Sequence, residues 1–145
     1  RVVVVDNESG DGSVERIVDW AAGAVPWAAP DSRLSHLTSP PLEKPVPIRV
    51  LDADVAVAEA PGEEWLAVVR AGDNLGFAGG NNLGIRHLLL DPAIEAFWLL
   101  NNDTVVEPTA ARALLTTVRA EPQAGMIGTV IRFYNAPDTV QAWAG

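Results

Sequence analysis

Three clusters of polar residues in this sequence carry side chains that suit a phosphorylated or metal-bound ligand. They are Asp6-Asn7, residues 74–82 and residues 101–104, and each follows an apolar run. Carboxylates accept hydrogen bonds or bind hard cations, and Asn carboxamides both donate and accept. Because ligands of parallel α/β sheets bind beyond the carboxyl ends of the strands, we expect the three clusters to meet at one sheet edge.

The cluster Asn101-Asn102-Asp103-Thr104 indicates a divalent cation. Mg²⁺ or Mn²⁺ binds oxygen ligands, often only one or two carboxylates, and completes its shell with water and substrate phosphate. A metal at Asp103 would offset charge on a diphosphate leaving group, and would let a chain of net charge -9 hold a diphosphate. The alternative for these four residues is an Asx turn, which is common after strands.

Residues 74–82 (Asn-Leu-Gly-Phe-Ala-Gly-Gly-Asn-Asn) combine three glycines with three asparagines. Glycine permits tight turns and a close approach of the backbone to a ligand. The residues alone favour equally a glycine-rich turn in which Asn81 or Asn82 caps the next helix. Arg86 lies one turn into that helix and could reach a phosphate, although a surface position is the commoner outcome for Arg.

The first cluster resembles a dinucleotide-binding fingerprint only superficially. Gly10-Asp11-Gly12 matches the start of G-x-G-x-x-G, but Glu15 stands at the third glycine position. A carboxylate in the first helical turn would repel a pyrophosphate, which disfavours an NAD site and leaves it as a third hypothesis. Asp6 can instead accept from a base N–H or a ribose hydroxyl; the alternative is that residues 6–13 form only a strand-to-helix turn.

The composition excludes several function classes. The chain has 145 residues, the size of one domain, with 10 basic and 19 acidic residues, which disfavours a nucleic-acid partner. The lack of cysteine rules out disulfides and cysteine nucleophiles and fits the cytoplasm. Val2–Val5, the longest apolar stretch near the start, is too short for a membrane span. His36 and His87 have no partner at ligand spacing, so we expect surface or packing roles.

The elements that would position these clusters follow from apolar periodicity and turn residues. The expected order β-α-β-β-α-β-α-β predicts a mostly parallel α/β sheet. Residues 23–47 form a long Pro-rich loop, and residues 52–64 have no assigned structure. The predicted strands are 2–5 (buried on both faces), 48–51, 66–69, 96–100 and 126–133, and the predicted helices are 14–22 (with Ser13 as N-cap), 82–90 and 108–120.

Four segments then resemble family-2 inverting glycosyltransferases. Residues 3–13 resemble their VVDNxSxDGS segment, and residues 74–84 their NxGFAGGNNxG segment. Residues 98–104 resemble a variant of the Asp-x-Asp motif, and residues 134–145 are similar to the YxxPxxxQxxGG stretch of the rhamnosyltransferase-like branch. The match covers most of residues 1–145, except about residues 23–65, which we interpret as an insertion.

The resemblance implies a Rossmann-like GT-A fold and the nucleotide-sugar-binding part of an inverting, metal-assisted glycosyltransferase. Asn101 replaces the first acidic residue of Asp-x-Asp, so the metal site has one carboxylate fewer. The implied roles are base contact for Asp6, nucleotide contact for Asn74, Gly79 and Gly80, ribose contact for Asn101 or Asn102, metal binding for Asp103, and further nucleotide-sugar contacts for Asn7 and Asn82.

The resemblance also implies that a strand precedes Arg1 and that an acceptor-binding half with the catalytic base follows Gly145. We therefore expect a fragment that binds the donor but is inactive alone; a binding module without turnover is the alternative function. The expected donor is deoxythymidine-diphosphate rhamnose or a uridine-diphosphate sugar, and the expected acceptor is a cell-surface glycan or a lipid-linked glycan. The expected location is the cytoplasm, at the inner face of the membrane through parts outside these residues.

Overall fold

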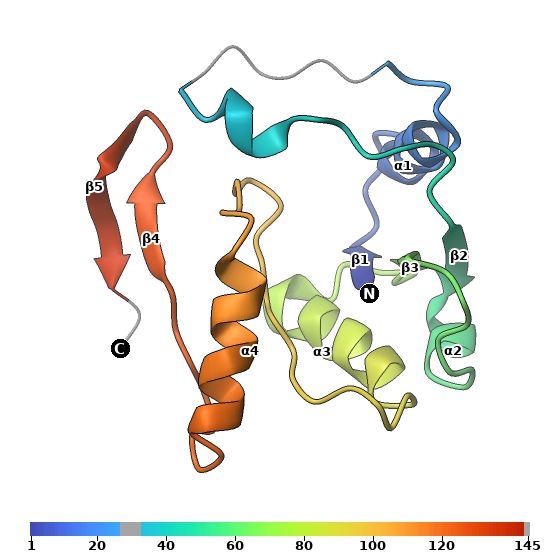
Figure 1. The fold of residues 1–145 in the computed structure, drawn as a ribbon. Helices are drawn as coiled ribbons and strands as arrows, with labels where there is room; N and C mark the ends of the chain where they lie inside the picture. Colours follow the sequence, from blue (N-terminus) through green and yellow to red (C-terminus); the bar gives the residue numbers. More distant parts are fainter. Residues whose placement is uncertain (27–32, 144–145) are drawn as a thin grey trace. The chain divides into compact units, whose positions relative to one another are not determined.

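The computed structural model describes residues 1–26 and 33–143 (Figure 1). The chain divides into two compact units. The first unit is formed by Arg1–Trp27 and Leu42–Leu99, and the second by Ala28–Pro41 and Leu100–Gly145. The fold is α/β, as the sequence predicts, and the parallel sheet lies entirely in the first unit.

The first unit contains three parallel strands in the order β1-β3-β2. The strands end level, because Asp6 and Asp52 are both register partners of Arg70. The predicted strands 2–5, 48–51 and 66–69 are confirmed. The elements in chain order are β1 (Val2–Asp6), α1 (Ser13–Ala22), β2 (Ile48–Asp52), α2 (Ala53–Ala56), β3 (Leu66–Arg70) and α3 (Gly76–Leu88).

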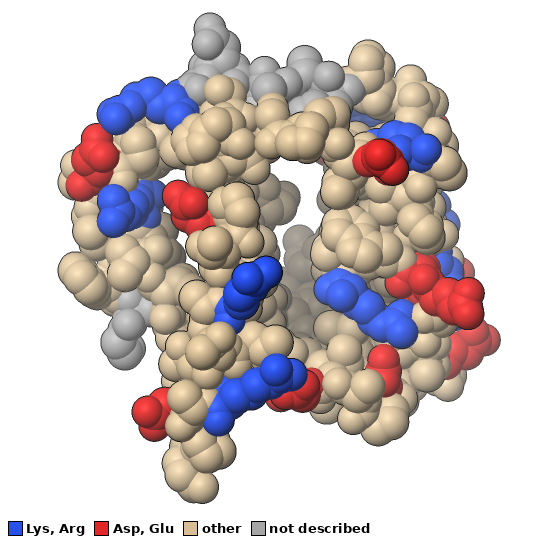
Figure 2. All heavy atoms as spheres, in the orientation of Figure 1, with Lys and Arg blue, Asp and Glu red and all other residues tan. Residues whose placement is uncertain are grey.

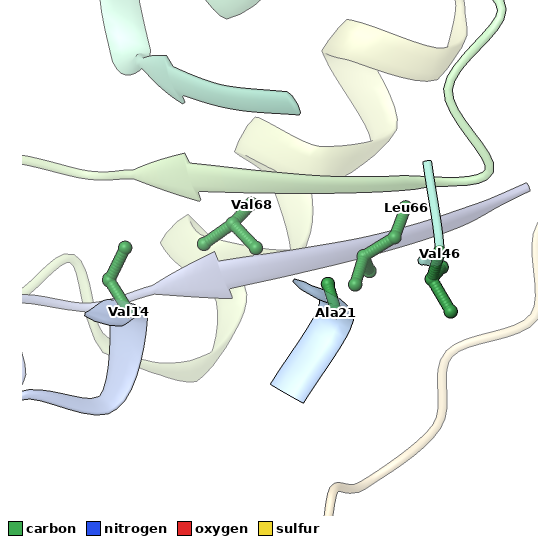
Figure 3. Packing of buried hydrophobic residues seen from close by; sticks show 5 residues of the cluster. All are labelled: Val14, Ala21, Val46, Leu66 and Val68. Atoms are coloured by element: carbon green, nitrogen blue, oxygen red, sulfur yellow. The ribbon is translucent and has the colours of Figure 1, made fainter. Parts of the chain in front are cut away.

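The two faces of this sheet bury alternate residues of each strand, as strand geometry requires. One face packs against α1 through a core cluster that Figure 3 shows from close by. The other face packs against α2 and α3. The first cluster is Val14, Ala21, Val46, Leu66 and Val68, and the second is Leu51, Ala56, Val69 and Leu83. The result is a helix–sheet–helix arrangement, visible in Figure 1.

Burial differs between the strands because of their places in the sheet. β3 is central, and Leu66–Val69 are all buried. The prediction that Val2–Val5 are buried on both faces is wrong, since Val2 is 40% exposed and the other three are half-buried. In the described part of the chain β1 pairs with β3 alone, so its second edge has no strand partner.

Two helix starts differ from the predicted ones. The N-cap of α1 is Gly12, at φ 77°, and not Ser13 as predicted. The backbone N–H and the hydroxyl of Ser13 both donate to the Asp11 carboxylate instead. α3 begins at Gly76 rather than residue 82, so the glycine-rich segment is helix and not a turn. Neither Asn81 nor Asn82 is a cap, and the Asn81 side chain donates to the Phe77 carbonyl oxygen at 2.9 Å.

The second unit contains η1 (Ser35–Thr38), α4 (Ala110–Ala120), β4 (Val130–Phe133) and β5 (Ala136–Trp143). α4 confirms the predicted helix, shortened by two residues. β4 lies within the predicted strand 126–133 but pairs antiparallel with β5, in a two-stranded sheet separate from the parallel one. In the predicted loop, the described residues 23–26 and 33–47 contain only one short helix, η1. Residues 27–32 of that loop lie outside the described residues.

The predicted strand 96–100 is wrong: these residues form neither strand nor helix. Phe97, Trp98 and Leu99 are 38–54% exposed. Their apolar character favours a strand, but a strand forms only when a neighbouring edge accepts its backbone groups. Among the described residues no strand pairs with them. Nor is any described helix both long and apolar enough to cross a membrane.

His87 is the fully buried polar side chain of the core. Its Nδ1 lies 2.8 Å from the carbonyl oxygen of Ala56, the last residue of α2. This contact satisfies a carbonyl at a helix C-terminus, where the helix itself supplies no donor. His87 thus has the packing role that the sequence suggests, whereas His36 is exposed.

We therefore expect His87→Ala to lower the free energy of unfolding by about 2–4 kcal/mol, through the lost hydrogen bond and the cavity left behind. Urea unfolding followed by tryptophan fluorescence measures the change. His36→Ala is the matched control and should stay close to wild type. Equal stability of the two variants would show that the buried contact contributes nothing.

Candidate functional site

The carboxyl edge of the parallel sheet brings the first two polar clusters together. β1 ends at Asp6, and the chain after β3 turns into α3 at Gly76. The Ala71 backbone N–H donates to the Asp6 carbonyl oxygen at 2.9 Å, which ties the two segments at that edge. Of the three clusters expected to meet at one sheet edge, residues 6–7 and 74–82 are in contact within the first unit, through Asn7 and the backbone of residues 75 and 76.

Asn7 makes the direct connection between these segments. Its Nδ2 donates to the Gly76 carbonyl oxygen at 3.0 Å, and its Oδ1 accepts from the Leu75 backbone N–H at 3.1 Å. Gly80 faces this side chain, since a Cβ on Gly80 would lie 3.5 Å from Nδ2. The half-buried carboxamide is therefore engaged with the backbone of the α3 entrance.

Asp6 is the acceptor at the end of β1. Both of its carboxylate oxygens accept from the Ser9 backbone N–H, at 3.3 and 3.4 Å. The same turn contains Glu8 in the left-handed region, at φ 65°. A carboxylate has about four lone-pair sites, so Asp6 retains acceptor capacity for a base N–H or a hydroxyl.

The entrance of α3 is lined by backbone amides. The Asn74 Oδ1 accepts from the Gly76 N–H at 3.0 Å, and the Asp73 carboxylate accepts from the Asn74 N–H. Helix geometry leaves the amides of Phe77 and Ala78 without an intrahelical acceptor. Both residues are exposed, so this end of α3 presents free N–H groups and the positive end of the helix dipole.

The glycines of this segment have different roles. A Cβ on Gly79 would lie 2.6 Å from the Leu75 Cβ, and one on Gly84 would lie 3.2 Å from a methyl group of Val5. Gly76, at φ 67°, takes the left-handed conformation at the first helical position. Asn82 is exposed on the second turn of α3. Gly80 and Gly84, which face Asn7 and Val5, let α3 approach β1 closely.

Arg70 is a cation at the same edge that the sequence reasoning missed. It lies at the end of the central strand, between Asp6 and Asp52 in the register, and its guanidinium is 3.4 Å from the Glu15 carboxylate. The signal in the sequence was a basic residue directly after the apolar run 66–69. Figure 2 shows acidic and basic side chains interspersed over the visible face, with no large basic patch on it. A negatively charged ligand would therefore meet single Lys or Arg side chains such as Arg70.

The third predicted cluster belongs to the second unit. Asn101, Asn102 and Asp103 are exposed, and the Thr104 hydroxyl donates to the Asn101 carbonyl oxygen at 2.7 Å, closing a turn. No strand leads into this turn, so the expectation that Asp103 follows a strand end is wrong. The structure brings together Asp6, Asn7, Asn74, Gly79 and Gly80 in the first unit, and Asn101, Asn102 and Asp103 in the second.

The donor atoms around Asp103 suit a hard cation only in part. Within residues 1–26 and 33–143, no three His, Cys, Asp or Glu side chains are grouped so that they could hold a metal ion. Asp103 would supply one carboxylate, next to the amide oxygens of Asn101 and Asn102. A Mg²⁺ or Mn²⁺ there would need its remaining ligands from water and from the phosphates of a bound molecule.

An open hollow of about 380 Å³ lies at the opposite end of the sheet. Two of its lining residues, Pro47 and Trp65, directly precede β2 and β3. Its walls are mostly apolar, and none of the predicted site residues lines it. The lining residues are Leu42, Glu43, Pro45, Val46, Pro47 and Trp65.

The turn between β1 and α1 contains a perturbed carboxyl. Hydrogen bonds from the Ser13 hydroxyl and backbone N–H hold the pKa of Asp11 below its ordinary value of 3.8. We expect Ser13→Ala to raise the pKa of Asp11 towards 3.8, because the charged form loses its strongest donor. Because the pKa of Asp11 is lower in the folded state than in the unfolded state, the ionised carboxylate adds to the free energy of unfolding above pH 4. This contribution is lost as the pH falls through the folded-state pKa.

A carboxyl-carbon NMR titration measures this shift. Ser9→Ala is the control, because Ser9 donates to Asp6 through its backbone N–H and not through its hydroxyl. An unchanged Asp11 titration in Ser13→Ala would contradict the assignment of the Ser13 hydroxyl as the main cause.

Three comparisons with known proteins found no match for this chain. The chain matches no protein-family model, no curated protein and no solved structure.

Proposed function

We propose that this chain is the nucleotide-sugar-binding part of an inverting glycosyltransferase of the family-2 type, with a GT-A fold. The observation that carries the proposal is the contact between the Asp6-Asn7 end of β1 and the N-terminal turn of α3 at one sheet edge. The four motif resemblances support it independently of the structure, because they rest on the sequence alone.

The edge offers complementary groups for the two parts of a nucleoside diphosphate. The Asp6 carboxylate would accept from the base or from a ribose hydroxyl. The free amides at the start of α3, together with the helix dipole, favour the negative charge of a phosphate. Asn74 and Gly79 would lie along the nucleotide, with Gly80 buried behind them against Asn7, and Asn82, Asn101 and Asn102 are further proposed contacts.

Asp103 is the proposed metal ligand. A Mg²⁺ or Mn²⁺ bound there would supply a positive charge to the diphosphate leaving group. Asn101 and Asn102 would flank it with neutral oxygens, so affinity for the cation would depend strongly on the bound diphosphate. The proposal therefore predicts little metal binding without nucleotide.

The proposed reaction is a displacement at the anomeric carbon. An acceptor hydroxyl loses its proton to a general base and attacks from the face opposite the diphosphate, so that the bond to the acceptor oxygen forms as the bond to the diphosphate breaks. The proposal assigns this base to the acceptor-binding part of such enzymes. The proposed donor is deoxythymidine-diphosphate rhamnose or a uridine-diphosphate sugar, and the proposed acceptor is a glycan or a lipid-linked glycan at the cytoplasmic face of the membrane.

A binding module without turnover is the second candidate. The clustering of nucleotide-suited groups in the first unit favours it, since that unit has a parallel sheet and a core of its own. Binding without transfer to supplied acceptors would distinguish this candidate from the enzyme.

Isothermal titration with deoxythymidine diphosphate and uridine diphosphate, each with and without Mn²⁺, tests the proposal. We expect wild type to bind at least one of them and Asp6→Asn to bind it about tenfold or more weakly, because a hydrogen bond to a charged acceptor is lost. Asp103→Asn should remove only the Mn²⁺ dependence.

Asp19→Asn is the matched control, because it removes the same charge from an exposed position on α1. Its affinity should equal that of wild type. If wild type binds neither nucleotide under any of these conditions, the proposed function is wrong.

A further inference from the structure

The carboxamide of Asn7 replaces a backbone peptide at the end of β1. It donates to the carbonyl of Gly76 and accepts from the N–H of Leu75, at 3.0 and 3.1 Å, as a neighbouring strand would. Asn7 is one residue beyond the end of β1, so the side chain continues the hydrogen bonding of the strand onto the entrance of α3.

Two glycines keep this contact short. Gly80 faces the Asn7 carboxamide, and Gly84, one turn further on, faces Val5 so closely that a Cβ would lie 3.2 Å from its methyl carbon. Both are buried. α3 therefore lies directly along β1. Among the hydrogen bonds of the described residues, those of Asn7 are the only ones by which a side chain from the β1 side holds the start of α3.

We propose that Asn7 is a positioning residue. It holds the first turn of α3 at a fixed place beside Asp6, so that the free amides of that turn and the Asp6 carboxylate can contact one nucleoside diphosphate together. Asn7 acts through the α3 backbone in this arrangement, because its Nδ2 and its Oδ1 each make a hydrogen bond to it. The ligand part of this inference rests on the proposed function.

A test of Asn7 must separate a shifted start of α3 from a general loss of stability. His87 lies at the other end of the same helix and also packs by one backbone hydrogen bond, so His87→Ala is the matched control. Asn7→Ala removes both hydrogen bonds to the entrance of α3. Asn7→Ser, which keeps a shorter donor and acceptor, is the milder variant if Asn7→Ala does not fold.

Two measurements on wild type and these variants test it. Titration with deoxythymidine diphosphate or uridine diphosphate should show about tenfold or greater loss of affinity in Asn7→Ala, a smaller loss in Asn7→Ser, and less than about twofold in His87→Ala. Amide hydrogen exchange should accelerate at Leu75, whose N–H donates to the Asn7 side chain, in Asn7→Ala, and near residues 84–90 in His87→Ala.

The outcomes separate the two proposals. If wild type binds and Asn7→Ala binds equally well, Asn7 does not position the site and the proposed function stands. If His87→Ala loses as much affinity as Asn7→Ala, the effect is general destabilisation and the positioning role is wrong. If wild type binds neither nucleotide, the proposed function fails and the ligand part of this inference fails with it.

Discussion

The close approach of α3 to β1 is the constraint on which the arrangement of the first unit depends. Gly80 and Gly84 remove the side chains that would separate helix and strand, and Val5 and Asn7 fill the contact from the other side. This contact fixes where the helix begins relative to the strand end. The position of the helix entrance beside Asp6, and with it any joint use of amides and carboxylate, is a consequence of packing.

Much of the first unit could be predicted from the sequence. The β-branched runs of β1, β2 and β3 are local signals, and turn residues after each run mark where the strands end. The rule that parallel strands present ligand groups at their carboxyl ends then placed residues 6–7 beside the start of the segment 74–82. The start of α3 was missed because glycine has low helix propensity, and here tertiary packing outweighs it.

The rest could not be predicted because it depends on pairing partners. Residues 96–100 have strand-like composition, yet composition does not say whether an edge is available to them. β5 contains Pro137 and Asp138, which are poor strand residues, and its hairpin with β4 depends on antiparallel pairing with irregular register. Arg70 was overlooked because its importance arises from its central place in the sheet, which only the strand order reveals.

The edge of β1 that has no strand partner affects the behaviour of the chain in solution. Its outer N–H and C=O groups have no ladder partner in the described part of the chain, and valines occupy four of its five positions without a protecting charge until Asp6. Such an edge is a template for strand exchange between molecules. At neutral pH a net charge of -9 keeps copies apart. Near the isoelectric point of about 4.5 that repulsion vanishes, so the free edge of β1 is then the part of the parallel sheet most open to pairing with another copy.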